Sequence, residues 1–290
     1  MVIPLLHVAS GANPDEWYLA WHADPLLTLL LGGSAAGYLL AYRAAALAGR
    51  RVPPRWQVLA YLGGLVSLAV ALMGPPDHFN GVLFSVHMVQ HLILMLVAAP
   101  LLVLGRPVQV LLRGLRPHHS RALMGITARH PGLRGLLGMV VHPMTVFLLY
   151  NGSFLFWHLP GPYQAAVRDE LIHDLEHVAF FGTALLFWWV LIDPVPRHYR
   201  LSTTAAALLL FATWMAGDLI CATITLSRNL IYPVYAETET PWGLTPLGDQ
   251  RLGGAIMWAS AGLYYAVVLI GLLAAPYLRT RPANHAGQHA

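Results

Sequence analysis

The amino-acid sequence predicts an all-α fold, a polytopic membrane helical bundle of about seven transmembrane helices. Three observations support this class. The 290-residue chain is 57% hydrophobic with only 10% charged residues, its mean hydropathy is +0.58, and its loops alternate between arginine-rich and arginine-poor. A soluble globular domain carries about 25% charged residues. The composition therefore excludes a soluble enzyme or a soluble binding module.

Seven stretches are apolar enough to cross a hydrocarbon core of about 30 Å, which takes roughly 20 helical residues. Their hydrophobicity surrounds each helix instead of forming one stripe, as is typical of packed membrane spans. The fourth and fifth stretches are short and should continue into their flanks. No internal repeat stands out, so the spans should form one domain. The predicted spans cover residues 26–48, 56–74, 83–104, 140–157, 175–192, 204–226 and 254–275.

Arginine predicts the orientation, because the chain contains no lysine. Fourteen arginines lie in the loops that follow spans 1, 3 and 5 and in the segment that follows span 7, all on one side of the membrane. Only Arg168, Arg228 and Arg251 lie on the other side. By the positive-inside rule, the N-terminus lies outside and the C-terminus lies in the cytoplasm. The predicted organisation is an extracytoplasmic segment over 1–25, a seven-helix domain over 26–278 and a disordered tail over 279–290.

The basic residues flank membrane spans, so the pI near 9.4 indicates contact with anionic lipid and no nucleic-acid partner. The loop 105–139 is a candidate for an interfacial amphipathic helix. The first 25 residues lack the basic region of a cleavable signal peptide. The single cysteine, Cys221, excludes an internal disulfide bond.

Five histidines within the apolar segments are the strongest functional signal. Ionisable side chains at membrane depth are costly and usually mark a function. Histidines four residues apart share one helical face. An isolated pair of this spacing is common, so the argument depends on the shared depth of all five, which the threading places near the outer boundary. They are the pair His87 and His91, the pair His173 and His177, and His158.

Four further side chains are candidate ligands at the same level. Asp218 is a carboxylate inside an apolar span and needs a cation or a donor. Met88, Met95 and Cys221 are secondary candidates, since thioethers and buried cysteines more often serve packing. A carboxylate such as Asp218, Asp174 or Glu176 could bind the metal or orient a ligand histidine.

The types of candidate ligand do not select one metal. Imidazole suits copper, zinc and iron, whereas methionine and cysteine favour copper(I). On chemistry alone, copper ranks first, haem second and zinc third. Two histidine-bearing spans could supply axial haem ligands. Three histidines with a carboxylate could hold a hydrolytic zinc ion, although no HExxH motif occurs.

The chain resembles the CtaG-type cytochrome c oxidase assembly factors of bacteria over about residues 17–275. The motifs HMVQH, WHLP, HxLEH and DQxxxGxxMW occur in the expected order, after an N-terminal WxxDP at Trp21–Pro25. The matching runs are HMVQHLILMLVAAPLLVLGRPVQVLLR (87–113), HPMTVFLLYNGSFLFWHLPGPYQAAVRDELIHDLEHVAFFGTALLFWW (142–189) and PLGDQRLGGAIMW (246–258).

The resemblance implies a multi-pass protein of the bacterial cell (inner) membrane that helps assemble haem-copper oxidase. It implies oxidase subunits as partners, copper as the cargo and the five histidines as its ligands. The leading hypothesis is an assembly factor and not an enzyme; the alternatives are a haem-binding redox protein and an intramembrane zinc hydrolase. Asp249 and Gln250 match a further motif of the family whose purpose the sequence does not reveal. The oligomeric state stays open.

Overall fold

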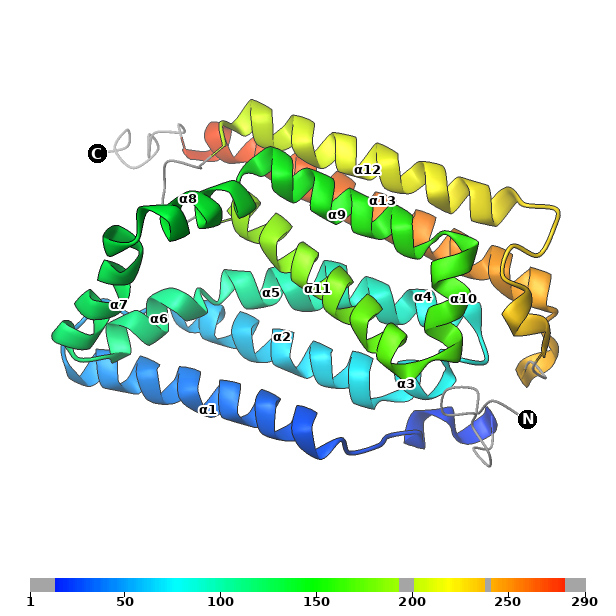
Figure 1. The fold of residues 1–290 in the computed structure, drawn as a ribbon, viewed down its shortest axis with the longest axis horizontal. Coiled ribbons are helices and arrows are strands. Elements are labelled where there is room, and N and C mark those ends of the chain that lie inside the picture. The colour runs from blue at the N-terminus through cyan, green and yellow to red at the C-terminus, as the bar shows by residue number, and fades with distance from the viewer. Residues whose placement is uncertain (1–13, 193–200, 238–240, 280–290) are drawn as a thin grey trace, which may run out of the picture.

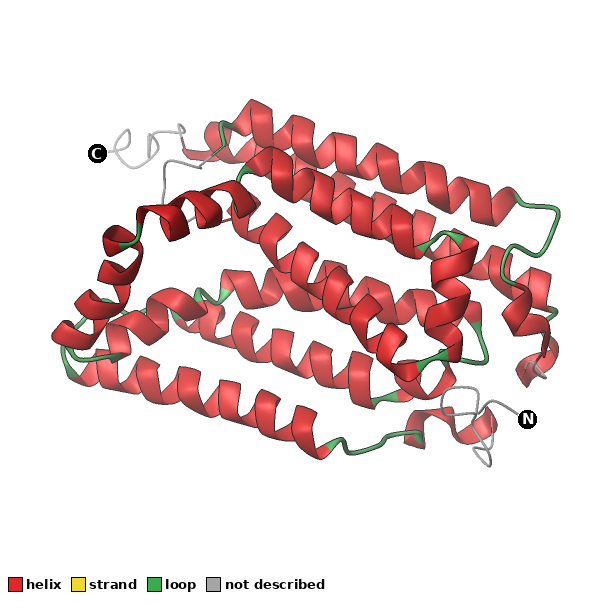
Figure 2. Ribbon diagram, viewed as in Figure 1, coloured by secondary structure: helices red, strands yellow, loops and turns green. Residues whose placement is uncertain are grey.

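The computed structural model describes residues 14–192, 201–237 and 241–279, and all regular structure within them is helical (Figure 1; Figure 2). Most of the long helices run roughly along one axis, with α11 crossing between them in this view (Figure 1). The all-α membrane class is thus confirmed. Apart from the helical Arg279, the expected tail over 279–290 lies outside the described residues.

Proline opens many of the helices, where its missing N–H costs nothing and its fixed φ suits the first turn. The described elements are η1 (Pro14–Leu19), α1 (Pro25–Leu47), α2 (Arg55–Met73), α3 (Pro75–Phe79), α4 (Phe84–Leu92), the π-helical η2 (Ile93–Ala98), α5 (Ala99–Leu104), α6 (Pro107–Gly114), α7 (Pro117–Arg129), α8 (Pro131–Val140), α9 (Pro143–Trp157), α10 (Pro160–Arg168), α11 (Glu170–Ile192), α12 (Thr203–Leu226), η4 (Pro233–Glu237), η5 (Pro241–Gly243) and α13 (Pro246–Arg279).

Six described helices are long and apolar enough to cross a membrane, or seven if the bent pair α8 and α9 counts as one span. The predicted spans 1, 2, 3 and 6 match closely. The fifth begins earlier, at Glu170, and the last begins at Pro246 and not near residue 254. The polar run that precedes residue 254 is therefore helical too, because its charged and amide side chains find partners inside the bundle.

The fourth span is broken. α8 and α9 meet at an angle of 54°. Pro143 cannot donate to the preceding turn, so the helix must restart there. The His142 ring caps the new helix by accepting from the Met144 amide at 3.3 Å. The loop 105–139 correspondingly forms three short helices, α6, α7 and α8, with no buried residue among those described in α7 and α8.

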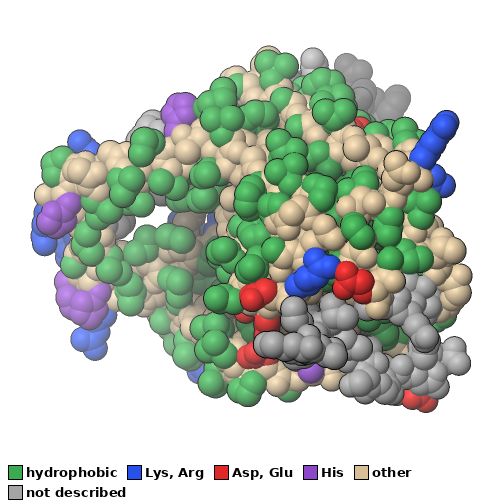
Figure 3. Space-filling view, turned by 45° about the vertical axis from the view of Figure 1, so that its right-hand side comes forward, with side chains coloured by type: hydrophobic (Ala, Val, Ile, Leu, Met, Phe, Trp, Pro, Cys, Tyr) green, Lys and Arg blue, Asp and Glu red, His purple; other side chains and the backbone are tan. Residues whose placement is uncertain are grey.

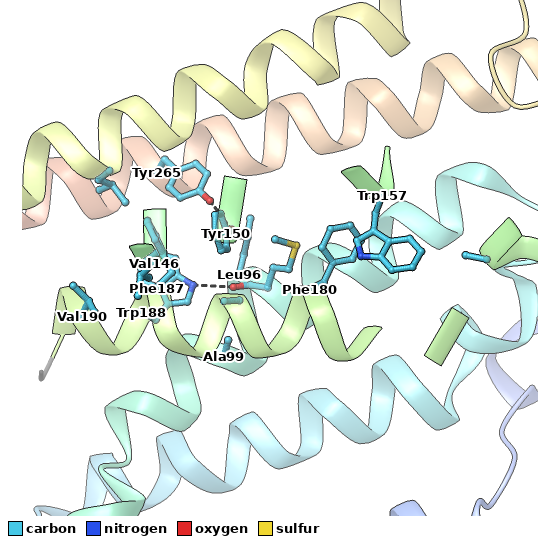
Figure 4. Packing of buried hydrophobic residues seen from close by; sticks show 14 residues of the cluster. Leu96, Ala99, Val146, Tyr150, Trp157, Phe180, Phe187, Trp188, Val190 and Tyr265 are labelled. Carbon is cyan, nitrogen blue, oxygen red and sulfur yellow. Dashed lines mark hydrogen bonds between the residues drawn. The ribbon is translucent and has the colours of Figure 1, made fainter. Parts of the chain in front are cut away.

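The third span changes helix type halfway. In η2 the amide of Ala99 donates to the Leu94 carbonyl, the five-residue step of a π-helix. The same step from Met95 would require an amide at Pro100, which has none. The Trp188 indole N–H supplies the missing donor to the Met95 carbonyl at 2.8 Å (Figure 4). This bond ties α11 to the third span below the histidines.

The core is apolar and aromatic, and most of the outer surface is apolar as well. Phe180, Phe187 and Trp188 of α11 pack with Tyr150 of α9 and Tyr265 of α13 in the largest cluster (Figure 4). Large exposed hydrophobic side chains occur on α1, α2, α9, α12 and α13, and they cover much of the surface between sparse charges (Figure 3). A belt of this kind suits contact with lipid tails.

α13 lies unusually close to two neighbours through adjacent glycines. A Cβ on Gly253 would stand 2.5 Å from the Phe84 ring and 3.0 Å from the Ser85 Cα of α4. A Cβ on Gly254 would stand 2.9 Å from the Thr225 amide nitrogen of α12. Small residues of this kind let membrane helices approach until their backbones touch.

We predict that Gly253→Ala lowers the thermal stability of the detergent-purified protein, because α13 must move away from α4. Overpacking of this size costs about 1–3 kcal/mol. Gly271→Ala is the matched control on the same helix, where a Cβ meets nothing within 4 Å. Melting temperatures of both variants test the contact, and equal melting temperatures would contradict it.

Candidate metal centre

α4 and α11 bring four of the five predicted histidines together. Ring centroids lie 5.0 Å apart for His87 and His173, and 5.6 Å apart for His91 and His177. Within each helix the four-residue spacing brings the ring centroids to 4.4 Å and 4.1 Å from each other, with the ring planes inclined. The four residues are only 1–7% exposed. The two histidine pairs thus form one buried cluster, as their shared depth predicted.

Glu176 joins this cluster from α11. One of its carboxylate oxygens lies 3.5 Å from His87 Nε2 and 3.9 Å from His91 Nε2. Two sets of ligand atoms fall within 4.8 Å of one another: His87, His91 and His177, and His87, His173 and Glu176. The Nε2 atoms of His87 and His173 are 3.3 Å apart, within the roughly 4.2 Å that two nitrogens can span on one ion at about 2.1 Å each.

A chain of hydrogen bonds fixes the tautomer of His87. Tyr235 donates its only proton to the Asn80 carbonyl at 3.0 Å, so it must accept from Tyr163 at 2.8 Å. Tyr163 has then spent its proton and accepts from His87 Nδ1 at 2.9 Å. His87 therefore carries its proton on Nδ1, and Nε2 presents a lone pair to His173 and Glu176. A partner that orients the ring in this way is typical of metal-bound histidines.

Burial raises the pKa of Tyr163 and of Tyr235 well above its usual value of 10.0. Both phenols therefore stay protonated at any physiological pH, so each remains able to donate its hydrogen bond. Tyr163 comes from α10 and Tyr235 from η4. The ring of His87 is thus oriented by two segments outside the membrane-spanning helices.

Several buried polar atoms of the cluster lack a hydrogen-bond partner. A buried polar atom without a partner costs free energy, and a buried charge costs more. In the described part of the chain such atoms are otherwise scarce, and most of them gather here. A bound cation would satisfy them. They are both ring nitrogens of His91, Nε2 of His177 and both carboxylate oxygens of Glu176, and Nε2 of His158 beside the cluster also lacks a partner.

His158 lies beside this cluster and not within it. It follows α9 and donates from Nδ1 to the Phe154 carbonyl at 2.7 Å, which leaves a lone pair on Nε2. Its ring is 5.9 Å from that of Phe180, which the His91 ring contacts at 4.6 Å. His158 belongs to neither described set of close ligand atoms.

Asp218 also stands apart from the histidine cluster. It is half-buried on α12 and in neither set of close ligand atoms. It lines a small cavity next to His91, together with Met88, Met95 and Cys221. The three sulfur side chains are fully buried. The predicted secondary ligands Met88, Met95 and Cys221 therefore line the same cavity as His91, and no other histidine of the cluster lines it.

The structure gives Asp249 a clear role. α4 begins after Leu83, whose side chain provides no cap. The Asp249 carboxylate accepts from the amides of Phe84 at 2.6 Å and Ser85 at 3.2 Å, and from the Ser85 hydroxyl. The first amides of a helix need such acceptors, and a negative charge also suits the helix dipole. α13 therefore holds the start of the helix that carries His87 and His91.

The neighbouring amides fix the surrounding segments. Gln250 accepts from the amides of Ile231 and Tyr232 and donates to the Asn229 carbonyl. Tyr232 in turn donates to the His158 carbonyl at 2.8 Å. Gln90, between the two histidines of α4, donates to the Ala71 carbonyl at 2.9 Å and to Asp77 at 2.8 Å.

Sequence reasoning named Glu176 only as one of three carboxylates that could bind or orient, and it did not place Tyr163 or Tyr235 in the site. The HxLEH motif contained a signal for Glu176, since the residue lies three positions after His173 and on nearly the same face. The two tyrosines carried no signal, because 72 residues separate them and only the tertiary fold brings their hydroxyls together.

Comparison with known proteins found mycobacterial relatives of unknown role. The chain is 30% identical over 277 residues to an uncharacterised protein of Mycobacterium leprae, covering 90% of this chain and 40% of that protein. It is 30% identical over 272 residues to an uncharacterised protein of Mycobacterium bovis, covering 87% of this chain and 39% of that protein. The chain thus spans about 40% of the length of these curated relatives.

No solved structure was found to match the chain. The sequence model of one family, described as "Cytochrome c oxidase caa3 assembly factor", matches residues 36–277. That range includes all four clustered histidines, Glu176, Tyr163, Tyr235 and Asp249. The chain belongs to the family of cytochrome c oxidase caa3 assembly factors.

Proposed function

We propose that this protein binds copper at the centre formed by His87, His91, His173, His177 and Glu176 and supplies it to a cytochrome c oxidase subunit during assembly. The observation that carries the proposal is the bond chain from His87 to Asn80, which turns the Nε2 lone pair toward His173 and Glu176. Neutral imidazoles are good ligands for copper. The family supports the destination of the metal.

The charge of the centre favours a monovalent ion. A carboxyl group must release its proton to bind a metal ion, and four neutral histidines with an ionised Glu176 would then sum to a single negative charge. A monovalent copper ion makes the buried centre neutral, whereas a divalent ion leaves a net positive charge out of water. Unbalanced buried charge is strongly unfavourable. Copper(I) is therefore the oxidation state that we propose.

Space argues against haem in this cluster. The histidine rings lie 4–6 Å from one another, and the cavity beside His91 has a volume of about 40 Å³. Pockets for small organic ligands usually have about 300–1,000 Å³. Zinc would accept the same histidines and carboxylate, so a competition between copper(I) and zinc belongs in the first experiment.

The proposed setting is the bacterial inner membrane, with the N-terminus outside. In that orientation the starts of α4 and α11, and hence the histidines, lie toward the outer face. A partner subunit of the oxidase would meet the centre from that side. The protein then acts as a carrier and not as a catalyst.

We predict that His87→Ala with His91→Ala abolishes retention of copper by the detergent-purified protein, because both members of the α4 pair are lost. Metal analysis after reduction and dialysis measures the content. Activity of the haem-copper oxidase in membranes of cells carrying the variant should fall in parallel.

The matched control is His118→Ala with His119→Ala, an exposed pair on α7. It should leave copper content and oxidase activity unchanged. Full oxidase activity in the His87 and His91 variant would contradict the proposal. A Soret band would show that the protein binds haem, and zinc that resists exchange with copper(I) would show that it binds zinc. Either result would contradict copper as the bound metal.

We predict that Tyr163→Phe weakens copper(I) binding by about 10–100-fold, the usual effect of removing a group that orients a ligand histidine. The ring of His87 loses its acceptor and is no longer held in one tautomer. Titration against a chromogenic copper(I) chelator measures the affinity.

Tyr61→Phe provides the comparison. It removes a buried hydroxyl that bonds to Ser34 at 2.6 Å, far along the chain from the histidines. The two variants should have similar melting temperatures but differ in copper affinity. Equal affinities would show that the bond chain does not orient His87.

A further inference from the structure

A small cavity lies against the histidine cluster on the side of α12 and α13. Its volume is about 40 Å³, enough for a water molecule or a single ion with a ligand. His91 forms part of the wall, and the remaining wall comes from α4, η2, α9, α12 and α13. It is therefore a partly open space next to the proposed metal centre, lined by both buried and partly exposed residues.

Four sulfur-containing residues line this cavity from four different elements. Met88 belongs to α4, Met95 to η2, Cys221 to α12 and Met257 to α13. All four residues are buried. Methionines often fill irregular gaps, but packing needs no cysteine and no imidazole on the same wall. Thioether and thiol sulfurs together are the ligands that select copper(I).

His91 provides an independent sign of a ligand. It is 98% buried, it lines the cavity, and neither of its ring nitrogens has a hydrogen-bond partner. A neutral imidazole has one lone pair, so His91 can bind an ion of the histidine cluster or an ion in the cavity, one at a time. Its Nε2 lies 3.9 Å from Glu176 of the cluster, and the residue also lines the cavity.

The far wall of the cavity leads toward the surface of the bundle. Trp214 and Asp218 line both this cavity and an open groove of about 400 Å³ between α12 and α13. Small residues of α13, among them Ala259 and Gly262, form the other side of the groove. Asp218 places a carboxylate between the two spaces, where a passing cation would meet a negative charge.

We propose that the cavity is a second binding site for a soft monovalent metal ion, held by His91 and the sulfurs of Met88, Cys221 and Met257, through which copper(I) passes between the histidine centre and the groove. This inference rests on the proposed function. It adds a route for the ion, which runs sideways between α12 and α13, and it gives the buried methionines a function. Asp218 acts at the outlet and not as a ligand of the histidine centre.

The test is a titration of the detergent-purified full chain with copper(I) in the presence of a competing chelator, combined with X-ray absorption at the copper edge. The wild-type protein should bind two ions, and sulfur should contribute to the average ligand set. Cys221→Ser with Met257→Leu should remove one ion together with the sulfur signal. Met257→Leu conserves volume and should disturb packing little.

Met215→Leu is the matched control, since Met215 is exposed on α12 and does not line the cavity. It should bind two ions like the wild type. His87→Ala should lose the other ion and keep a sulfur-bound one, because His87 does not line the cavity.

The outcomes separate the two proposals. One ion with nitrogen and oxygen ligands alone, unaffected by Cys221→Ser with Met257→Leu, overturns the second site and leaves the histidine centre standing. A single sulfur-bound ion that His87→Ala does not change supports the cavity and overturns the histidine centre. Silver(I), which is soft and monovalent, should compete for the cavity ion, whereas zinc should not.

Discussion

The absence of water around buried polar atoms is the constraint on which this structure depends. A bundle immersed in lipid has to satisfy such atoms from within the protein, since each unsatisfied group costs several kcal/mol. The amides at the start of α4 are satisfied by Asp249 of α13, the Met95 carbonyl by Trp188 of α11, and Gln90 by the carbonyl of Ala71. These bonds join spans that are distant in sequence. The atoms left over gather at the histidines.

This division makes the histidine cluster rigid. The four histidines lie on α4 and α11, while other elements hold them in place: a cap from α13 and hydroxyls from α10 and η4. The Trp188 indole of α11 also ties its own helix to the third span. Side chains held by their surroundings keep their relative positions without a ligand. Under the proposed function, such a cluster would take up and release an ion without refolding around it.

The helical period was sufficient to predict the spans and the two histidine pairs, because both depend on neighbours in sequence. His87 and His91 share a face by spacing alone, and their common level with His173 and His177 follows from threading. The break at Pro143 and the early start of α13 at Pro246 were missed, since hydropathy does not register how polar residues are satisfied. Asp218 was placed in the site because its depth matched, although its position around α12 turns it toward a neighbouring cavity. Tyr163 and Tyr235 could not be predicted, because nothing local relates them to His87.

The π-helical segment within the third span lets α4 and α5 face different directions around the helix axis. A π turn adds one residue to each hydrogen-bonded loop, so the angular position of α5 no longer follows from that of α4. Above the segment, the helix directs imidazoles at α11; below it, Leu102 fits closely against Gly64 of α2. Lineages of this family could therefore exchange residues at the lower helix contact, to suit another membrane thickness or another neighbour, without turning the imidazoles of α4 away from α11.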